Sequence, residues 1–301
     1  MSERYQLLME QIKAGKPVLI DGATGTEVER RGVPKIKFAW NADGNLSSSQ
    51  VVQQVHEDYI RCGARIIISN TFATHRSTLE DAGVGDQFEA YNRRAVEIVC
   101  AARESLGADN VLVAGGLSHW SFTGRAPPLQ ILGASAAEQA RIMADAGADL
   151  LLLEMMASID HTRAVLDGAL ASGLPVWVGY SCKLDEHSQV VLLEGEPLAD
   201  AIGALQGLDV PLISIMHTDV EIVSQCLDVV QACWNGPVGV YAHSGEFEEN
   251  AGIKFDTVIS EQGYCDYVKQ WLGRGVNVIG GCCGVGPEHI AHLAATHHFS
   301  T

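Results

Sequence analysis

Two adjacent cysteines near the end of the chain, Cys282 and Cys283, are the side chains best suited to chemistry. They follow a β-branched run and lie between glycines in the segment "GGCCGVG". Such a pair can be packing residues, a strained disulfide or two ligands of one metal ion. A disulfide between neighbouring residues requires a strained ring, and a reducing compartment works against it. The flanking glycines free the backbone to turn both sulfurs the same way, which favours the metal.

His217 is the best third ligand by position, because it directly follows the apolar run in "LISIMHTDVE". A Cys2His set is typical of catalytic zinc sites, in which a fourth position stays open for substrate. Thiolates also select zinc over magnesium or calcium. We therefore predict that His217, Cys282 and Cys283 bind Zn²⁺, with no catalytic residue separate from this metal site. Three histidines remain open as rival third ligands: His75, His119 and His243.

The elements that must position these residues form a repeating pattern. A short apolar run ends in a polar or glycine-containing loop, and a helical segment follows. We expect strands at Val18–Asp21, Arg65–Asn70, Val111–Ala114, Leu150–Glu154, Val176–Tyr180, Leu212–Met216, Val238–Tyr241 and Val276–Gly280. Runs that are apolar on both faces and alternate with helices indicate a parallel sheet covered by helices.

Eight strand–helix units over 301 residues predict a (β/α)8 TIM barrel. The opening segment "MSERYQLLMEQIKAGKP" has the pattern of a short amphipathic helix, which we expect to close the bottom of the barrel. No long linker or low-complexity tract interrupts the chain. Residues 1–301 are therefore predicted to form one α/β domain. A doubly wound open sheet is the alternative fold.

The expected strands end in polar or reactive side chains, and barrel enzymes place their active sites at the C-terminal ends of the strands. These side chains belong to Asp21, Asn70, Thr71, Ser118, His119, Glu154, Ser181, Cys182, His217, His243, Ser244, Cys282 and Cys283. Loops are usually polar in any protein. Thiols and imidazoles at one rim nevertheless favour an enzyme over a structural protein.

Composition narrows the classes of partner. The formal net charge of −17 disfavours binding to nucleic acid or to an anionic membrane surface. No apolar run approaches the roughly 18 residues of a membrane span, and the N-terminal segment has no apolar core of a signal peptide. We therefore expect a cytoplasmic protein with small-molecule partners. The sequence offers no clear oligomerisation motif.

The motifs, taken in order, resemble the zinc-dependent homocysteine S-methyltransferases. "LIDGATGTEVERRG" is similar to the family's first strand and loop, and "VHEDYIRCGARIIISNTFATH" to its second unit. "ADAGADLLLLEMM" resembles the fourth unit, "VYAHSGE" the seventh and "GGCCGVGPEHI" the metal-binding eighth. The resemblance implies a (β/α)8 barrel in which zinc holds the thiolate of homocysteine.

The resemblance also implies a pocket for the amino-acid end of the acceptor. Asp21 and Glu154 match acidic residues associated with the substrate's ammonium group. Gly22 and Ala23 lie where backbone N–H groups receive its carboxylate, and Thr71 falls in a motif that lines the same pocket. These residue types fit an amino acid, which needs an anion for its ammonium group and N–H donors for its carboxylate.

The chain departs from the family pattern in two places. The strand-six ligand of the family is a cysteine preceded by asparagine, and here Met216–His217 stand there. The seventh motif usually has proline and asparagine before its serine, and here it has Ala242–His243. A neutral imidazole makes the metal centre less anionic than a third thiolate would. This lowers the pKa of the substrate thiol and also reduces the nucleophilicity of its thiolate.

The expected activity is zinc-dependent transfer of a methyl group from an onium donor, such as S-methylmethionine or betaine, to a thiol. Homocysteine is the default acceptor, which gives methionine. Four aromatic residues are candidates to face a methylated cation: Trp40, Phe72, Trp120 and Tyr241. The donor and the acceptor remain open at this stage. A metal-dependent hydrolase on the same barrel and a non-catalytic metal- or thiol-binding homologue are the alternatives.

Overall fold

The structure is a computed structural model, and it describes residues 2–245, 247–248, 252–253 and 257–299. Within these ranges one parallel sheet of eight strands has the order β1-β12-β9-β8-β5-β4-β3-β2. Its strands are β1 (Val18–Leu19), β2 (Ile66–Ile68), β3 (Leu112–Leu117), β4 (Leu150–Met156), β5 (Val176–Tyr180), β8 (Ile213–Asp219), β9 (Val238–His243) and β12 (Val278–Ile279). All eight predicted strands are present.

The sheet closes on itself between its first and last strands. Ile20 forms a parallel bridge with Ile66. The Arg65 N–H donates to the Leu19 carbonyl, and the Asp21 N–H donates to the Ile66 carbonyl, at 2.8 and 3.0 Å. These contacts join β1 to β2, so the predicted (β/α)8 barrel is confirmed and the open doubly wound sheet is excluded.

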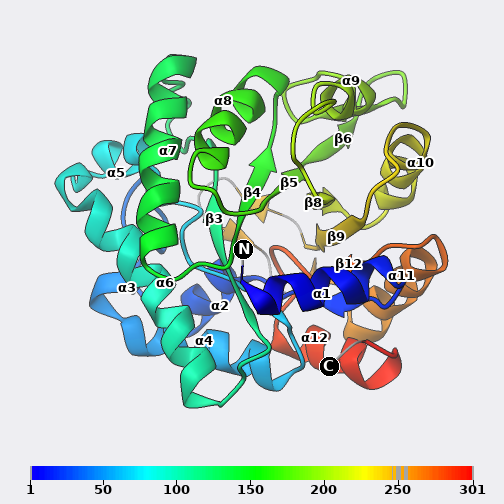
Figure 1. The fold of residues 1–301 in the computed structure, drawn as a ribbon, viewed down its shortest axis with the longest axis horizontal. Helices are drawn as coiled ribbons and strands as arrows, with labels where there is room; N and C mark the ends of the chain where they lie inside the picture. Colours follow the sequence, from blue (N-terminus) through cyan, green and yellow to red (C-terminus); the bar gives the residue numbers. More distant parts are fainter. Residues whose placement is uncertain (1, 246, 249–251, 254–256, 300–301) are drawn as a thin grey trace.

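Helices surround the strands in Figure 1. They are α1 (Glu3–Lys13), α2 (Thr24–Arg30), α3 (Gly44–Ser47), α4 (Ser49–Arg61), α5 (Arg76–Asp81), α6 (Phe88–Ser105), α7 (Leu129–Asp145), α8 (Ile159–Leu170), α9 (Leu198–Gly203), α10 (Val223–Cys233), α11 (Glu261–Gly273) and α12 (Pro287–Thr296). Among the described residues, none of these helices combines the length and the apolar character that a bilayer span requires.

Strand residues alternate between the inside of the barrel and the layer beneath the helices. In β4, Leu150 and Leu152 belong to the interior cluster, whereas Leu151 and Leu153 pack in the cluster that includes helix side chains. Neighbouring side chains of a strand point to opposite faces, which explains why the run of four leucines is buried on both sides. The same alternation directs Glu154 into the barrel.

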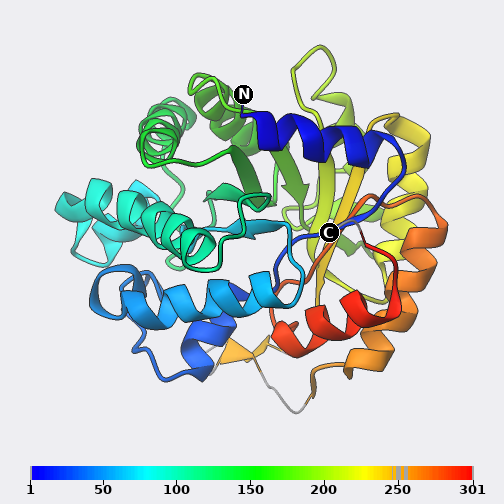
Figure 2. The same ribbon diagram turned by 60° about the horizontal axis from the view of Figure 1, so that its bottom comes forward.

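Helix α1 closes one end of the barrel, as predicted. Its residues Tyr5, Leu8 and Ile12 pack in the interior cluster with residues from the starts of the strands. The buried Trp177 Nε1–H donates to the Tyr5 hydroxyl at 3.1 Å. Figure 2 shows α1 lying across this end of the strands.

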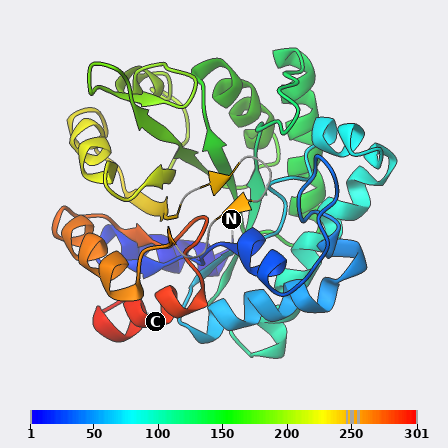
Figure 3. The same cartoon turned by 180° about the vertical axis from the view of Figure 1, so that it is seen from behind.

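Two short hairpins lie beyond the barrel strands and were not predicted. One consists of β6 (Cys182–Leu184) and β7 (Val190–Leu192), and the other of β10 (Phe247–Glu248) and β11 (Gly252–Ile253). Figure 3 shows β10 and β11 crossing the centre of the view, at the end of the barrel opposite α1. Because α1 covers the end at which the strands begin, the open end of the barrel is the one at which they terminate.

Candidate functional site

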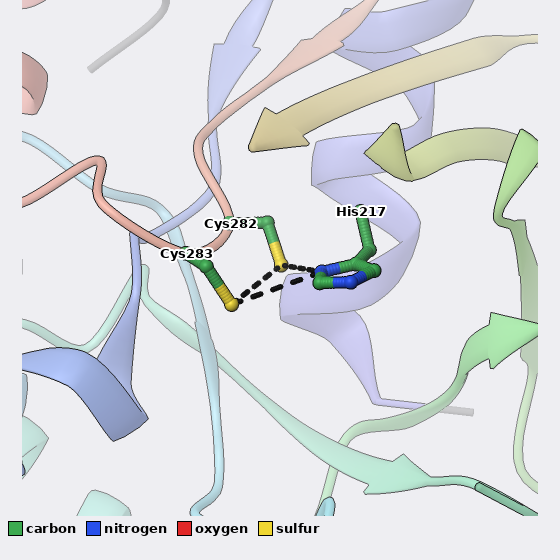
Figure 4. A group of neighbouring side chains, drawn as sticks. All are labelled: His217, Cys282 and Cys283. Atoms are coloured by element: carbon green, nitrogen blue, oxygen red, sulfur yellow. Dashed lines mark hydrogen bonds between the residues drawn. The ribbon is translucent and has the colours of Figure 1, made fainter. Parts of the chain in front are cut away.

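One histidine and two cysteines form a compact group at this open end. The Nδ1 of His217 lies 3.6 Å from the Sγ of Cys282 and 3.7 Å from the Sγ of Cys283. The two sulfurs are 3.9 Å apart. Figure 4 shows the imidazole edge facing both sulfurs. Residues 65 positions apart in the sequence are thus brought together by two strands, β8 and β12, that lie on either side of β9.

These separations suit a tetrahedral ion bound by two thiolates and one imidazole. Zinc bonds of about 2.3 Å to sulfur and about 2.0–2.1 Å to nitrogen, at tetrahedral angles, place two sulfurs roughly 3.8 Å apart. The same bonds place each sulfur roughly 3.6 Å from the nitrogen. The three side chains therefore fit a zinc-sized ion as they stand, and their donor types suit a borderline-soft metal.

An irregularity in β8 turns His217 into the barrel. Met216 already faces the interior, so regular alternation would direct the next side chain outward. The register of β8 against β9 shifts between Met216 and Asp219, and His217 has a φ of 42°. A left-handed conformation is costly for a residue other than glycine and is concentrated at functional sites.

The loop that contains the cysteines is fixed on both sides by backbone hydrogen bonds. The Cys282 N–H donates to the Ala242 carbonyl at 2.8 Å, and the Ser244 N–H donates to the Cys283 carbonyl at 3.0 Å. Gly284, which follows, has a φ of 83°, and a Cβ there would collide with the Ser244 carbonyl. The turn that aims both sulfurs inward therefore requires glycine at this position.

The hydrogen bond between the two thiols shifts their pKa values in opposite directions. It raises the pKa of Cys282, which burial raises further, and it lowers the pKa of Cys283. The sulfur of Cys283 is accordingly the first of the two to become a thiolate. A thiolate is the form that ligates metal.

Glu154 lies near the sulfur pair with its carboxylate buried. A Cβ at Gly116 would collide with Oε2 of Glu154, so the carboxylate occupies space that only a glycine leaves free. Burial, and next the nearby Cys282, raise the pKa of Glu154 to about 8. The group forms no ion pair within the described residues, so it lacks the partner that a buried carboxylate requires.

Asp21 is a second buried carboxylate, close enough to Glu154 for that group's negative charge to act on it. Its Oδ2 accepts a hydrogen bond of 2.8 Å from the Ile68 N–H, whereas Oδ1 has no partner in the described part of the chain. Burial raises the pKa of Asp21 well above its ordinary value, and the negative charge of Glu154 adds to this shift. Two carboxylates without a cation are thus held close to the sulfur pair.

The three other predicted acceptor-binding residues, Gly22, Ala23 and Thr71, differ in the hydrogen bonds that they already make. The Ala23 N–H already donates to the Val285 carbonyl at 3.0 Å. Gly22 makes no such backbone bond among the described residues, so its N–H is the available donor of the two. The Thr71 hydroxyl donates to the Gly116 carbonyl at 2.7 Å, which fixes the strand segment against which Glu154 lies. The roles of all three toward a substrate stay predictions.

Comparison with known proteins identifies the family to which this chain belongs. The sequence model described as Homocysteine S-methyltransferase matches residues 18–297. The chain belongs to this family. Like other members, it is an S-methyltransferase, and methyl transfer to a thiol is its general chemistry.

Relatives in this family cover nearly the whole chain. Homocysteine S-methyltransferase of Escherichia coli is 28% identical over 92% of this chain and 94% of its own length. Selenocysteine Se-methyltransferase of Brassica oleracea var. italica is 24% identical over 96% of this chain and 91% of its own. The crystal structure of the E. coli homocysteine methyltransferase MmuM in its metallated form has a TM-score of 0.79. It is 26% identical, and the match covers 94% of this chain and 96% of that one.

The three rival histidines, His75, His119 and His243, have different surroundings in the structure. His75 has both ring nitrogens bonded, to Ser77 and to the Trp120 carbonyl, at 3.0 and 2.8 Å. His243 lies beside His217, with the two ring centroids 4.7 Å apart. Burial, and next the neighbouring His217, lower the pKa of His243 to about 4. His119 lies in a different group of side chains, described below.

Three of the four predicted aromatic residues contact the barrel interior. Tyr241 belongs to the interior cluster, and Phe72 and Trp120 pack against it, as Cys282 does. Trp40 packs in a separate cluster, and its indole N–H donates to Glu29 at 3.1 Å. The loops after β2 and β3 and strand β9 therefore bring three aromatic side chains to the same interior cluster that Cys282 contacts.

Sequence reasoning missed Gly116 and the polar end of Tyr241. The paired glycines in "VLVAGGLSHW" were a signal that a bulky group needs space beside this strand. The Tyr241 hydroxyl is buried without a hydrogen-bond partner among the described residues. Its pKa is raised by burial and then by Glu154, Cys282 and Asp21, so the hydroxyl lies within their field. An unpaired hydroxyl in a cavity with polar walls is available to a ligand.

Proposed function

We propose that the protein is a zinc-dependent S-methyltransferase that moves a methyl group from an onium donor to the thiol of an amino acid. Homocysteine is the default acceptor, and its product is methionine, which assigns the reaction to methionine biosynthesis. S-methylmethionine and betaine are the donors to test first. The donor set formed by His217, Cys282 and Cys283 supports zinc, because its spacing suits tetrahedral Zn–S and Zn–N bonds.

The observation that carries the proposal is the pair of buried carboxylates beside the sulfurs. Asp21 and Glu154 have pKa values raised by burial, and the described residues offer them no cation. The ammonium group of an amino acid supplies that charge and favours ionisation of both groups. An acceptor held there by its ammonium end directs its side-chain thiol toward Cys282 and Cys283. A thiol without an amino group would leave both carboxylates unsatisfied.

The metal, when bound, supplies a thiolate at neutral pH by lowering the pKa of the acceptor thiol. The chain's own residues do the rest by orientation. Asp21 and Glu154 bind the ammonium group, and the free N–H of Gly22 donates to the carboxylate. The aromatic rings of Phe72, Trp120 and Tyr241, which pack in or against the interior cluster that Cys282 contacts, are the proposed surface for the methyl donor. Holding two reactants in line accounts for most of the expected rate gain.

The reaction balances without an oxidant or a further co-reactant. The acceptor thiol loses its proton to solvent. The sulfur lone pair then forms a bond to the methyl carbon, and the bond from that carbon to the onium sulfur or nitrogen breaks. The donor leaves as a neutral thioether or amine with the bonding pair. A positively charged methyl donor is stabilised by aromatic faces through cation–π attraction.

A methyl-transfer screen tests the proposal. The zinc-loaded protein is incubated with S-methylmethionine, betaine or trimethylsulfonium as donor, and with homocysteine, selenocysteine or cysteine as acceptor. Mass spectrometry measures the methylated acceptor. We expect methionine from homocysteine, with loss of product in the double variant C282A/C283A. The exposed His187→Ala variant is the matched control and should retain activity. Absence of product with every pair would refute the proposal.

The compartment follows from the same chemistry. All eight cysteines are free in the structure, including the pair that would ligate zinc. Thiol ligands and a thiol substrate must stay reduced to function, which supports a reducing cytoplasmic location. Small-molecule partners are expected, and the net charge of −17 gives no support to nucleic acid as a partner.

A further inference from the structure

A second group of metal-binding side chains lies outside the site described above. His119, His161 and Glu194 each offer a ligand atom, and these atoms all lie within 4.8 Å of one another. His119 follows β3, His161 is in the first turn of α8, and Glu194 follows β7. The group therefore joins two loops and the start of one helix at the open end of the barrel.

The two imidazoles of this group, from His119 and His161, lie face to face. Their rings stack with centroids 4.9 Å apart and planes inclined by 12°. Two imidazolium ions would repel at this separation, so at least one ring is neutral. Burial, and next the neighbouring His161, lower the pKa of His119 to about 3. The lone pair of the neutral ring, on Nε2, accepts the Ala157 N–H at 3.3 Å, so an ion bound there must displace this hydrogen bond. Ligation requires such a lone pair.

Hydrogen bonds around the group orient the ligands. The Nδ1 of His161 lies 2.6 Å from the Ser158 hydroxyl, and in the tautomer whose Nδ1–H donates to that oxygen the Nε2 lone pair is free for a ligand. A second hydrogen-bonding partner of this kind is usual for metal-binding histidines. The Ala157 N–H donates to His119 at 3.3 Å, and the Glu194 N–H donates to the Ala157 carbonyl at 3.1 Å. Residues 157–158 thus make hydrogen bonds to all three residues of the group.

We propose that His119, His161 and Glu194 form a second site for a divalent transition metal ion of the zinc class. Two imidazoles and a carboxylate are a usual zinc donor set. Parallel rings cannot both aim at one ion, so one imidazole must turn about its Cβ–Cγ bond. Ligand atoms of a tetrahedral ion are about 3.3–3.4 Å apart, so the group must also contract. This site therefore binds more weakly than the preformed thiol site.

The site would fix residues that line the mouth of the barrel. Trp120 follows His119 and Leu193 precedes Glu194, and both pack in the interior cluster that includes Cys282. An ion held by the adjacent side chains ties these two residues to α8. The proposal concerns metal binding and does not depend on the methyl-transfer reaction.

Cobalt titration distinguishes the two sites, because Co²⁺ bound to thiolates gives an intense sulfur-to-metal charge-transfer band and Co²⁺ bound to imidazole and carboxylate does not. The metal-free protein is titrated while absorption and bound cobalt are both measured. We expect two equivalents of cobalt, with the charge-transfer band complete at the first. In the double variant C282A/C283A, one equivalent should bind without that band.

Substitutions in the group formed by His119, His161 and Glu194 test whether it binds the weaker of the two cobalt equivalents. His161→Gln and Glu194→Gln change partly or fully exposed side chains, so their effect on folding should be small. Each should lower the bound cobalt from two equivalents to one and leave the charge-transfer band intact. The exposed His187→Gln variant is the matched control and should bind two. Binding of one equivalent by the parent protein, or of two by both variants, would overturn the proposal.

Discussion

The Nδ1 of His217 lies 3.6 Å from the Sγ of Cys282, although each residue reaches the cavity by a local departure from regular structure. His217 has a φ of 42° at a register shift in β8, and Cys282 lies in a glycine-flanked turn after β12. Such departures cost about 1–3 kcal/mol for a strained residue, and they persist only where the surrounding structure holds them. The fold stabilises a nitrogen–sulfur separation that suits a bound metal.

The exchange His217→Cys should retain metal and change the pH dependence of the reaction. A third thiolate adds negative charge to the ligand set, so the pKa of the acceptor thiol should rise. The acid limb of the kcat/KM profile should then move to higher pH, and the rate above it should increase because nucleophilicity rises with pKa. His187→Cys makes the same exchange at an exposed position and should leave the profile unchanged. Identical profiles for parent and His217→Cys would contradict this prediction.

Glu154→Gln should stabilise the metal-free, acceptor-free protein at alkaline pH. The pKa of Glu154 is raised from an ordinary 4.5 to about 8 in the folded state. Its contribution to stability is therefore complete below about pH 4.5 and is lost as pH rises through about 8. The neutral glutamine avoids that loss, and each kcal/mol regained raises Tm by roughly 2–4 °C.

Thermal unfolding at about pH 5 and about pH 9 checks this sign, since linkage predicts a larger gain at the higher pH. The exposed Glu221→Gln variant makes the same exchange at the surface and should show no such difference. An equal change in Tm at both pH values would show that Glu154 is not the group that titrates.

Gly116→Ala should impair acceptor binding without unfolding the barrel. A methyl group at this position overlaps Oε2 of Glu154, so the carboxylate must move. A displacement of about 1 Å in a positioning group can reduce kcat/KM by up to about 100-fold. The acceptor KM should rise in steady-state assays. Gly203→Ala, whose added Cβ meets nothing within 4 Å, is the control and should behave as the parent does.

Tyr5→Phe should destabilise the barrel and leave catalysis unchanged. The substitution removes the partner of the buried Trp177 indole N–H at the end of the barrel opposite the cavity. An unsatisfied buried donor costs about 1–3 kcal/mol, which denaturant unfolding measures. Tyr267→Phe removes a hydroxyl for which the described residues provide no hydrogen-bond partner, so it should be nearly neutral. A normal unfolding free energy for Tyr5→Phe would mean that water replaces the lost partner.

The alternating residues of the barrel could be predicted from the sequence. The run Leu150–Leu153 followed by Glu154 indicates a strand buried on both faces with a carboxylate at its end, and the structure agrees. The eight strand–helix units and the cap formed by α1 also follow from the pattern of apolar runs and helices, although that pattern left an open sheet as the alternative to a closed barrel. These features depend on local periodicity, which a single sequence records directly.

The site depends on features that local periodicity does not record. Regular alternation would turn His217 away from the cavity, and only the register shift in β8 reverses this. The hairpin β6–β7, which precedes Glu194, was missed because its strands are only three residues long. His161 was overlooked because a histidine in a first helical turn is usually a surface residue. Long-range packing determines which of these side chains meet.

X-ray absorption at the zinc edge tests the central claim most directly, with one equivalent of zinc bound and with homocysteine absent or present. Before homocysteine is added, the account predicts two sulfur ligands and at least one imidazole, from Cys282, Cys283 and His217. Addition of homocysteine should raise the sulfur count to three. A count that stays at two would contradict activation of the acceptor thiol by the metal, and fewer than two sulfurs at the outset would contradict the ligand set itself.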